Sequence, residues 1–533
     1  MTKLALLMSV RRTIIASVVA LAAALAAPTE ARTFRFAAQS DYASLDPHAL
    51  NEVFTLGLHG TVYEGLVKRD RNLALVPGLA ERWETLDPLR WRFHLRRGVT
   101  FHDGSPFTAD DVLFSAQRAR APGSDLKERI PADATFVKVD DYTVDVVLKT
   151  PNPILPAEWE TWYITSRAWA ERNGAIAPAA AGTTGYATLH ANGTGPFVLV
   201  GHQPGVRTVW RANPAWWGVR EHNLDEAVFT PIASDPTRVA ALLTGEVDMV
   251  EPVPPRDIPR VEAGPNTRVL AGPELRTIFL GLDQRRDELL YSDVEGRNPF
   301  KDVRVRQAFA KAIDLDLIRD RIMRGTSEPA ALLISPLLFA SAKDFKPATV
   351  DLDGARRLLA EAGYPQGFGV GLDCPNDRYV NDEAICQAIV GMLARIGVRV
   401  SLNAQPKAKF FAKVLAGGGY DTSFYLLGWT PNSFDSWNVF ATLLACRDDK
   451  GTRGPFNLGG YCNPALDALA ARILVETDTP KRDAMIREAW AMERADVSHI
   501  PLHQQGLAWG VSRSVEMVQR ADNQILLYWV RME

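Results

Sequence analysis

Helix-like and strand-like segments alternate along this chain, and no long flexible linker separates them. Residues 33–41 alternate apolar and polar side chains as a strand does, and residues 193–213 have the pattern of a β-hairpin. Residues 302–323 carry apolar side chains at helical spacing. A helical pattern from residue 381 ends at Gly397 and continues directly into a strand, which is an α/β unit. The chain is therefore predicted to adopt a mixed α/β fold.

The length and the missing linkers together constrain the domain organisation. A chain of 533 residues is too long for one ordinary hydrophobic core, so several domains are expected. No repeat or low-complexity segment divides the chain. We therefore expect domains that are joined by crossings of the chain and are not arranged one after another.

Composition and charge exclude some classes of partner. Hydrophobic residues make up 47% and charged residues 23%, as in ordinary globular proteins. The formal net charge is -3, and no run of Lys and Arg stands out. Such a chain has no overall field that attracts nucleic acid or an anionic membrane, so neither is predicted as a partner.

The N-terminus has the features of a secretory signal peptide. Positive charges precede an apolar, Ala-rich stretch, and Thr29 and Ala31 occupy the -3 and -1 places of a small-residue cleavage site. We predict a signal peptide over residues 1–31, with an uncleaved anchor helix as the alternative. No Cys follows the site, so a lipid anchor is not expected. Export to an oxidising compartment is the consequence.

Export permits disulfides among the four cysteines. Cys446 and Cys462 flank a Gly-rich loop that a bridge would close, and we predict that they pair. Cys386 falls within a helical pattern. It either pairs with Cys374 or is an unpaired core residue, and the sequence leaves both alternatives open. No C-x-x-C spacing is present, which argues against a zinc or redox site.

Motifs for catalysis and for cofactors are not found. His499 and His503 are four apart, but Pro501 between them argues against a metal-binding helix. His102 and Asp103 precede a glycine, which is typical of a hairpin turn. The sequence contains no G-x-S-x-G, P-loop, H-E-x-x-H or dinucleotide motif. We therefore predict no enzyme, no cofactor and no metal site.

Aromatic residues are the more informative signal. One segment places Trp429, Phe434 and Trp437 close together between a strand-like and a helix-like run. These rings either pack on one another in a hairpin tip or buried turn, or they form the wall of a ligand pocket. In the second case Asn432 or Asp435 would fix the polar end of an organic ligand. These residues alone leave both interpretations open.

A series of short motifs occurs in one order along the exported chain. They are SLDPH, VYEGL, PGLAERWE, WRFHLRRGVTFHDGSPFTADDVLFS, GTGPFVL, ANPAWWG, ALLTGEVDMV and DVRVRQAFAKAIDLDLI. In this order and spacing they resemble the family 5 extracellular solute-binding proteins of ABC importers, which include dipeptide-, oligopeptide- and nickel-binding proteins. Each motif is weak alone, whereas the ordered set is highly specific and extends over nearly the whole exported chain.

The resemblance implies a two-lobed periplasmic-binding-protein fold of type II, with an extra inserted domain and a ligand cleft between the lobes. The core of lobe I would combine residues 32–65, 193–280 and 503–533. The inserted domain of lobe I would span 66–192, and lobe II would span 281–502. This arrangement agrees with the absence of linkers noted above.

The resemblance also implies a ligand site. Dipeptide-binding members carry an Asp three positions after the residue that matches Trp429, and it pairs with the α-amino group of the ligand. The matching residue here is Asn432, and an amide cannot form that charge-assisted bond. This departure argues against a free-amine peptide unless Asp435 replaces the missing carboxylate. Arg378 is a candidate anchor for a ligand carboxylate, with a surface or structural ion pair as the alternative.

Aromatic stacking completes the predicted site. Trp429, Trp437 and Trp162 are expected to cover the ligand, and Gly428 and Tyr42 are expected to contact it. The ligand implied is a dipeptide, oligopeptide, or peptide-like or opine-like solute. A monomeric periplasmic protein would deliver it to the permease of an ABC importer. The alternative function is a secreted hydrolase of peptides or glycans, which needs a nucleophile–base pair or two carboxylates in one pocket.

Overall fold

The computed structural model describes residues 31–180, 183–448 and 453–533. The predicted signal peptide lies outside these residues, apart from Ala31. An eleven-stranded sheet runs through the molecule in the order β15-β14-β16-β12-β17-β11-β1-β10-β9-β8, with β13 beside β17. Its strands are β1 Thr33–Ala38, β8 Phe197–Gln203, β9 Arg207–Ala212, β10 Glu226–Pro231, β11 Met249–Glu251, β12 Thr267–Leu282, β13 Glu328–Pro329, β14 Gly369–Pro375, β15 Arg399–Gln405, β16 Phe424–Trp429 and β17 His499–Ser512.

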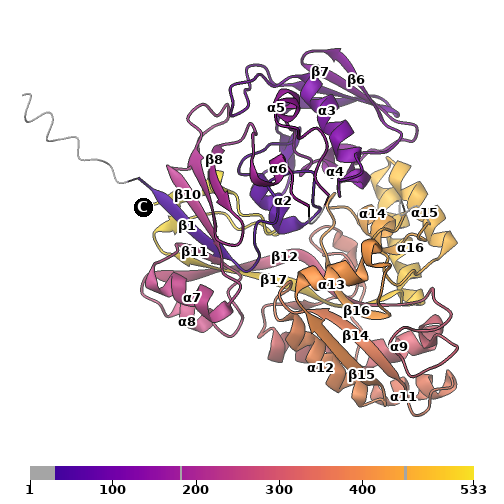
Figure 1. The fold of residues 1–533 in the computed structure, drawn as a ribbon. Helices are drawn as coiled ribbons and strands as arrows, with labels where there is room; N and C mark the ends of the chain where they lie inside the picture. Colours follow the sequence, from indigo (N-terminus) through magenta and orange to yellow (C-terminus); the bar gives the residue numbers. More distant parts are fainter. Residues whose placement is uncertain (1–30, 181–182, 449–452) are drawn as a thin grey trace, which may run out of the picture.

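Two long antiparallel strands, β12 and β17, join the two halves of this sheet (Figure 1). Their pairing covers residues 267–273 with 506–512, and then 277–281 with 499–504. The register shifts between Pro273 and Thr277, so the ladder is interrupted midway. One end of the ribbon continues into β11 and β1, and the other continues into β16 and β14. Two lobes therefore share a two-stranded connection, as the lack of linkers predicted.

Each lobe contains parallel strands joined by helices. In lobe I, β10 and β11 flank β1 in parallel, and α7 (Asp235–Thr244) connects them before ending at Gly245 with φ +78°. In lobe II, β14 and β15 pair in parallel through α12 (Asp382–Ala394). The predicted α/β unit is therefore confirmed at α12 and β15.

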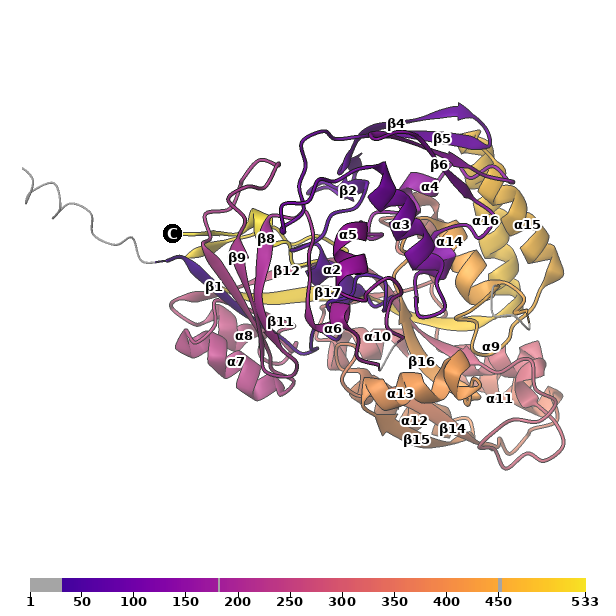
Figure 2. The ribbon, with the colours of Figure 1, turned by 45° about the horizontal axis from the view of Figure 1, so that its top comes forward.

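A separate four-stranded antiparallel sheet forms the inserted domain (Figure 2). Its order is β4-β5-β7-β6, with the strands β4 Ala80–Asp87, β5 Arg90–Leu95, β6 Thr135–Asp140 and β7 Thr143–Val147. α3 (Ala109–Arg120) begins at the predicted capping box, in which the backbone N–H of Thr108 donates to Asp111 at 2.9 Å. Two short pairs complete the strands: β2 Val67–Arg69 with β3 Leu75–Pro77, and β18 Val515–Glu516 with β19 Arg531–Met532.

The remaining helices cover the sheets and differ in length. They are α2 Val53–His59, α4 Leu155–Glu158, α5 Arg167–Arg172, α6 Tyr186–Leu189, α8 Ile258–Glu262, α9 Val303–Ala312, α10 Leu315–Leu317, α11 Leu352–Glu361, α13 Lys407–Val414, α14 Ser436–Val439, α15 Pro464–Val475 and α16 Thr479–Asp496. None of the helices in the described residues is long and apolar enough to span a membrane.

The hydrophobic cores follow the same division. Two clusters lie within residues 278–502, two lie in the lobe I segments, and one gathers residues 66–164 around the four-stranded sheet. Separate cores on either side of β12 and β17 allow the lobes to move as units. The residue at which each domain begins and ends stays a prediction.

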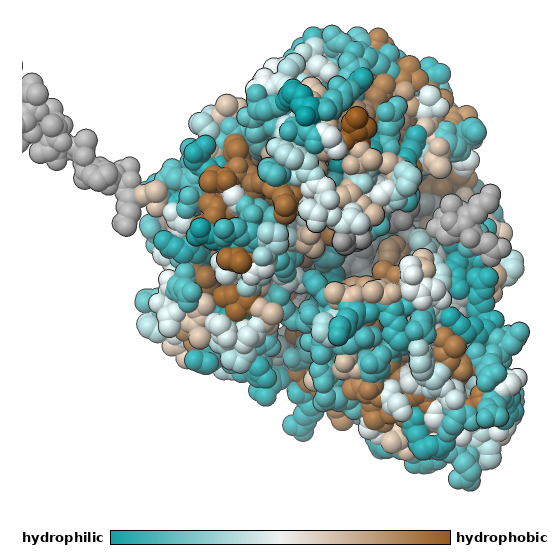
Figure 3. Space-filling view, in the orientation of Figure 1, coloured by the Kyte–Doolittle hydropathy of each residue, from teal (hydrophilic) through white to brown (hydrophobic). Residues whose placement is uncertain are grey.

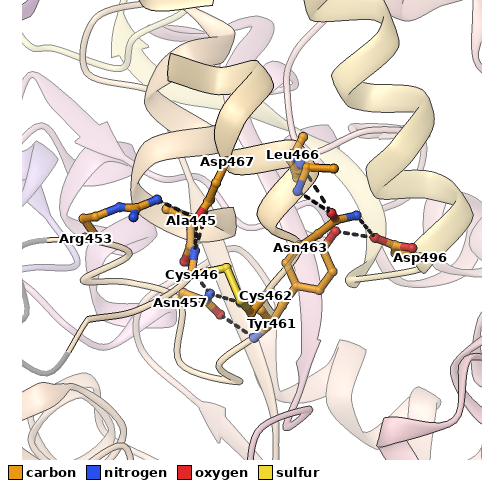
Figure 4. Close-up of a disulfide and its surroundings, with 11 residues drawn as sticks. Ala445, Cys446, Arg453, Asn457, Tyr461, Cys462, Asn463, Leu466, Asp467 and Asp496 are labelled. Atoms are coloured by element: carbon orange, nitrogen blue, oxygen red, sulfur yellow. Dashed lines mark hydrogen bonds and ion pairs between the residues drawn. A yellow bond between two sulfur atoms is a disulfide. The ribbon is translucent and has the colours of Figure 1, made fainter. Parts of the chain in front are cut away.

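Both pairs of cysteines form disulfides. The predicted bond joins Cys446 to Cys462, and the adjacent Asn457 amide donates to the carbonyl oxygens of Ala445 and Tyr461 (Figure 4). A second bond joins Cys374 at the end of β14 to Cys386 in α12. The sequence had left this second pair open.

Candidate functional site

A hollow of about 340 Å³ lies between the lobes. Lobe I contributes Gln39, Pro252 and Arg256 to its lining, and lobe II contributes Asn376 and Tyr379. The space-filling view is also hollowed between the upper and lower bodies (Figure 3). A volume of this size lies at the lower end of the range for small-molecule sites.

A smaller recess of about 40 Å³ adjoins the hollow, because the two share Gln39, Pro252 and Val380. The recess is also lined by Arg378 of lobe II, by Arg276 of the hinge strand β12 and by residues of lobe I. It therefore lies against the hinge ribbon, where β12 carries Arg276. Charged side chains at the base of a crevice between two lobes are suited to orient a polar solute.

Arg378 lies in the segment between β14 and α12, and several bonds hold that segment. The Asp382 carboxylate accepts hydrogen bonds from the backbone N–H groups of Arg378 and Tyr379, both at 2.9 Å. The disulfide between Cys374 and Cys386 ties the two ends of the segment together. The sequence-predicted anchor is therefore placed at the crevice by local structure of lobe II.

The Arg378 guanidinium forms an ion pair with Glu52 of lobe I at 3.2 Å. Glu52 precedes α2, and its carboxylate also accepts from the backbone N–H groups of Phe54 and Thr55. Burial alone raises the pKa of Glu52, but the charges of Arg378 and Lys407 and the two N–H donors outweigh this effect and lower the pKa to about 2. Glu52 therefore stays ionised and bridges the lobes.

Two further contacts cross between the lobes. Lys407 of lobe II donates from Nζ to the Ser40 hydroxyl of lobe I at 2.8 Å. Arg69 of the inserted domain donates to the backbone oxygen of Ser433, and its guanidinium lies 3.9 Å from the ring centroid of Phe434. These contacts, together with the bond from the Val380 backbone N–H to the Gln505 side chain at 3.2 Å, hold the lobes against each other in a closed arrangement.

Comparison with known proteins agrees with this architecture. The model of the bacterial extracellular solute-binding proteins, family 5 (middle), matches residues 74–451. That match covers more than half of the chain. The chain belongs to the family 5 extracellular solute-binding proteins.

Its relatives within this group bind different solutes. The dipeptide-binding protein of Escherichia coli is 27% identical over 496 residues, which cover 87% of this chain and 88% of that protein. The glutathione-binding protein GsiB of Pectobacterium atrosepticum is 28% identical over 506 residues, covering 93% of each. The structure of AgaA from A. tumefaciens with agropinic acid has a TM-score of 0.80 at 23% identity and covers 94% of this chain and 99% of that chain.

The predicted aromatic wall of this solute-binding protein lies at the end of β16. The Trp429 indole N–H donates to the Asn438 side chain at 2.9 Å, and its ring centroid lies 4.9 Å from that of Phe456. Trp437 packs against the same hydrophobic core, and both tryptophans are partly exposed. The two rings therefore combine a packing role in lobe II with an exposed surface.

Asn432 and Gly428 lie near this wall. Asn432 is partly exposed. Gly428 has no room for a Cβ atom, because such an atom would come within 2.8 Å of the side chains of Ile278 and Tyr379. Its carbonyl accepts a long contact of 3.5 Å from the Tyr379 hydroxyl.

Asp435 has a structural role instead of the ligand-binding role proposed for it. Its carboxylate caps α14 by accepting from the backbone N–H of Trp437. It also forms a bidentate ion pair with Arg482 of α16, at 2.7 and 2.8 Å. Because both oxygens are engaged within lobe II, Asp435 does not replace the carboxylate missing at Asn432.

Trp162 and Tyr42 are core residues, which corrects their proposed contact with ligand. Trp162 is fully buried in the inserted domain, with its ring 4.9 Å from that of Trp159. Tyr42 is 1% exposed in the core of lobe I, and its hydroxyl bonds His59 at 2.7 Å. Aromatic residue type alone does not distinguish a core from a pocket, so the sequence could not separate these cases.

The structure adds functional residues that the sequence did not indicate. Glu52, Lys407 and Arg69 form contacts between the lobes, and each of their partners lies hundreds of residues away in the chain. No local motif marks such residues. Among the described residues, no group of His, Cys, Asp and Glu is arranged to hold a metal ion.

Proposed function

We propose that this family 5 protein is the periplasmic substrate-binding component of an ABC importer. It captures a peptide or peptide-like organic solute between its lobes and delivers it to the membrane permease. The observation that supports this most directly is the hollow lined by both lobes beside a two-stranded hinge. The relatives named for dipeptide and glutathione binding support the class of solute.

Binding would act by a shift between open and closed populations. A solute that touches both lobes stabilises the closed form by contacts that the open form lacks. The bonds of Arg378, Lys407 and Arg69 across the crevice add to that preference. At micromolar affinity the binding free energy is about -8 kcal/mol, part of which is spent on closing.

Recognition would combine one charged anchor with aromatic cover. Arg378 directs an acidic group of the solute, because its buried Nε–H has no hydrogen-bond acceptor in the described chain. Trp429, Trp437 and Asn432 are not among the residues that line the hollow or the recess, so their contact with the solute stays a prediction. A buried polar group left without a hydrogen-bond partner costs roughly 1–3 kcal/mol. Such a pocket therefore rejects solutes whose donors and acceptors do not match its own.

Native mass spectrometry of protein purified from the periplasm tests the proposal. We expect one small molecule per monomer, released unchanged when the protein is denatured and raising the melting temperature when it is added back. A ligand at 100 times its dissociation constant adds about 2.7 kcal/mol to stability. Conversion of the added molecule into products would favour the alternative, a secreted hydrolase.

A further inference from the structure

A carboxylate of lobe I, Glu251, lines the interlobe recess and takes part in no ion pair within the described part of the chain. It ends β11 and is followed by Pro252, which lines both the recess and the hollow. Oε1 of Glu251 accepts one hydrogen bond, from the Asn523 side chain at 3.0 Å. Oε2 forms no hydrogen bond or ion pair with residues 31–180, 183–448 and 453–533, although the charge of Arg378 lies near enough to act on this carboxylate. A carboxylate oxygen in such a place can accept a hydrogen bond from a solute.

The position of this carboxylate is set by a chain of hydrogen bonds from the core. Trp509 of β17 is fully buried and donates its indole N–H to the Asn523 side-chain oxygen at 2.9 Å. That bond fixes which end of the Asn523 amide is its oxygen, so the NH₂ group points to Glu251. The backbone carbonyl of Glu251 also accepts from the N–H of Gln39 at 3.0 Å. The carboxylate is therefore held in place before any solute arrives.

The other acids around the recess already have cationic partners. Glu274 pairs with Arg276 at 3.1 Å, and Glu52 pairs with Arg378 at 3.2 Å. With Glu251 and Lys407 included, three carboxylates and three cations lie at or around the recess, and none of these cations lies within ion-pair distance of Glu251. Lys407 reaches Ser40 at the same recess, but it has Asp41 and Asp377 as additional acidic neighbours. Glu251 is therefore the carboxylate of the recess lining that has no ion-pair partner of its own among the described residues.

The volumes indicate which part of a solute fits each space. A cavity of about 40 Å³ holds a group of the size of a water molecule, such as an ammonium. The adjoining hollow of about 340 Å³ has room for the remainder of a small organic molecule. The amine of the solute would enter the recess, and its body would lie in the hollow.

We propose that Glu251 binds a primary ammonium group of the solute, so that the ligand class is a zwitterionic, amino-acid-like or peptide-like molecule. This inference rests on the proposed function and deepens it. It also accounts for Asn432: the amine is received by lobe I next to the hinge, and no carboxylate is needed in the loop that follows Trp429. Arg378 lines the same recess from the opposite lobe.

Paired probes test the assignment. The probes are an equimolar library of free dipeptides with glutathione, and the same compounds N-acetylated, which removes the ammonium charge. Native mass spectrometry identifies the members that bind, and calorimetry measures the tightest free and acetylated pair. The variants are Glu251→Gln, which keeps the oxygen that accepts from Asn523, and Glu251→Asp, which keeps the charge. Glu246→Gln removes an exposed carboxylate of the same lobe and is the charge control.

We expect the unmodified protein to prefer the free amine by at least tenfold. Glu251→Gln should weaken binding of the free amine by at least tenfold and change binding of the acetylated probe by less than twofold. Glu251→Asp should retain a preference for the free amine, and Glu246→Gln should behave as the unmodified protein does. A matched thermal melt verifies that each variant is folded.

Two results would overturn the assignment while leaving solute binding intact: a Glu251→Gln protein that still prefers the free amine, or an unmodified protein that does not distinguish the two forms. An unmodified protein that binds no member of either set would contradict the proposed peptide-like solute as well. The failure of this inference and the failure of the proposed function are thus distinguishable.

Discussion

Removing the ion pair between Glu52 and Arg378 should open the lobes. The pair joins lobe I to lobe II at 3.2 Å, with side-chain exposures of 24% and 12%. A hydrogen bond to a charged group contributes about 1.5–3 kcal/mol. Because the pair exists only when the lobes meet, its loss should shift the closing equilibrium by roughly 10- to 150-fold toward the open form.

Single-molecule Förster resonance energy transfer measures the equilibrium between the open and closed forms. All four native cysteines are in disulfides, so two cysteines introduced at exposed sites can carry the dyes. Val219 of lobe I is 82% exposed, and the side chain of Asp353 of lobe II is 93% exposed. Glu52→Gln, Arg378→Gln and the double variant are compared with the labelled parent at the same salt concentration.

The double variant isolates the interaction. Glu52→Gln keeps a side-chain oxygen for the N-terminus of α2, so the effect on the helix is limited. If the pair stabilises the closed form, the double variant should open no more than either single variant, and the coupling should be about 1.5–3 kcal/mol. Additive effects, or single variants with an unchanged distribution of distances, would refute the reasoning.

Three further predictions concern stability and affinity. Burial raises the pKa of Glu493 to about 7, so the unfolded chain loses this proton near pH 4.5 while the folded protein keeps it. The free energy of unfolding therefore falls as pH rises from 4.5 to 7. In urea unfolding, Glu493→Gln should be about 2–4 kcal/mol more stable than the parent at pH 8 and equal to it at pH 4. Equal stability of the two proteins at both pH values would contradict this. Replacing Cys374 and Cys386 together by alanine should lower the free energy of unfolding by about 2–4 kcal/mol. It should also weaken solute binding, because it frees the segment that carries Arg378. Unchanged calorimetric affinity would show that the disulfide does not position Arg378. Trp429→Phe keeps an aromatic ring but loses the indole donor to Asn438, so the melting midpoint should fall by the equivalent of about 1 kcal/mol; an unchanged midpoint would argue against that bond.

The sequence predicted the elements whose signals are local. The capping box at Thr108 and Asp111, the hairpin of β8 and β9 and the helix–strand unit closed by Gly397 all depend on residues within one turn or one strand of each other. The order of the motifs then indicated the family, and with it the two-lobed fold.

The site was harder to predict because its residues meet only in the folded protein. Asp435 is bound by Arg482, which is 47 residues away, and Glu251 is held by Asn523, which is 272 residues away. Spacing in the sequence does not show such partners. Trp162 illustrates the same point, since a buried ring and a ligand-stacking ring have the same side chain.

A crystal structure of the complex with the co-purified solute is the most direct test. We expect the solute in the space shared by the hollow and the recess, touching lobe II through Arg378 and lobe I through Glu251, and chemically unchanged. A solute bound on the outer surface of one lobe, or a cleaved product in the crevice, would contradict the account.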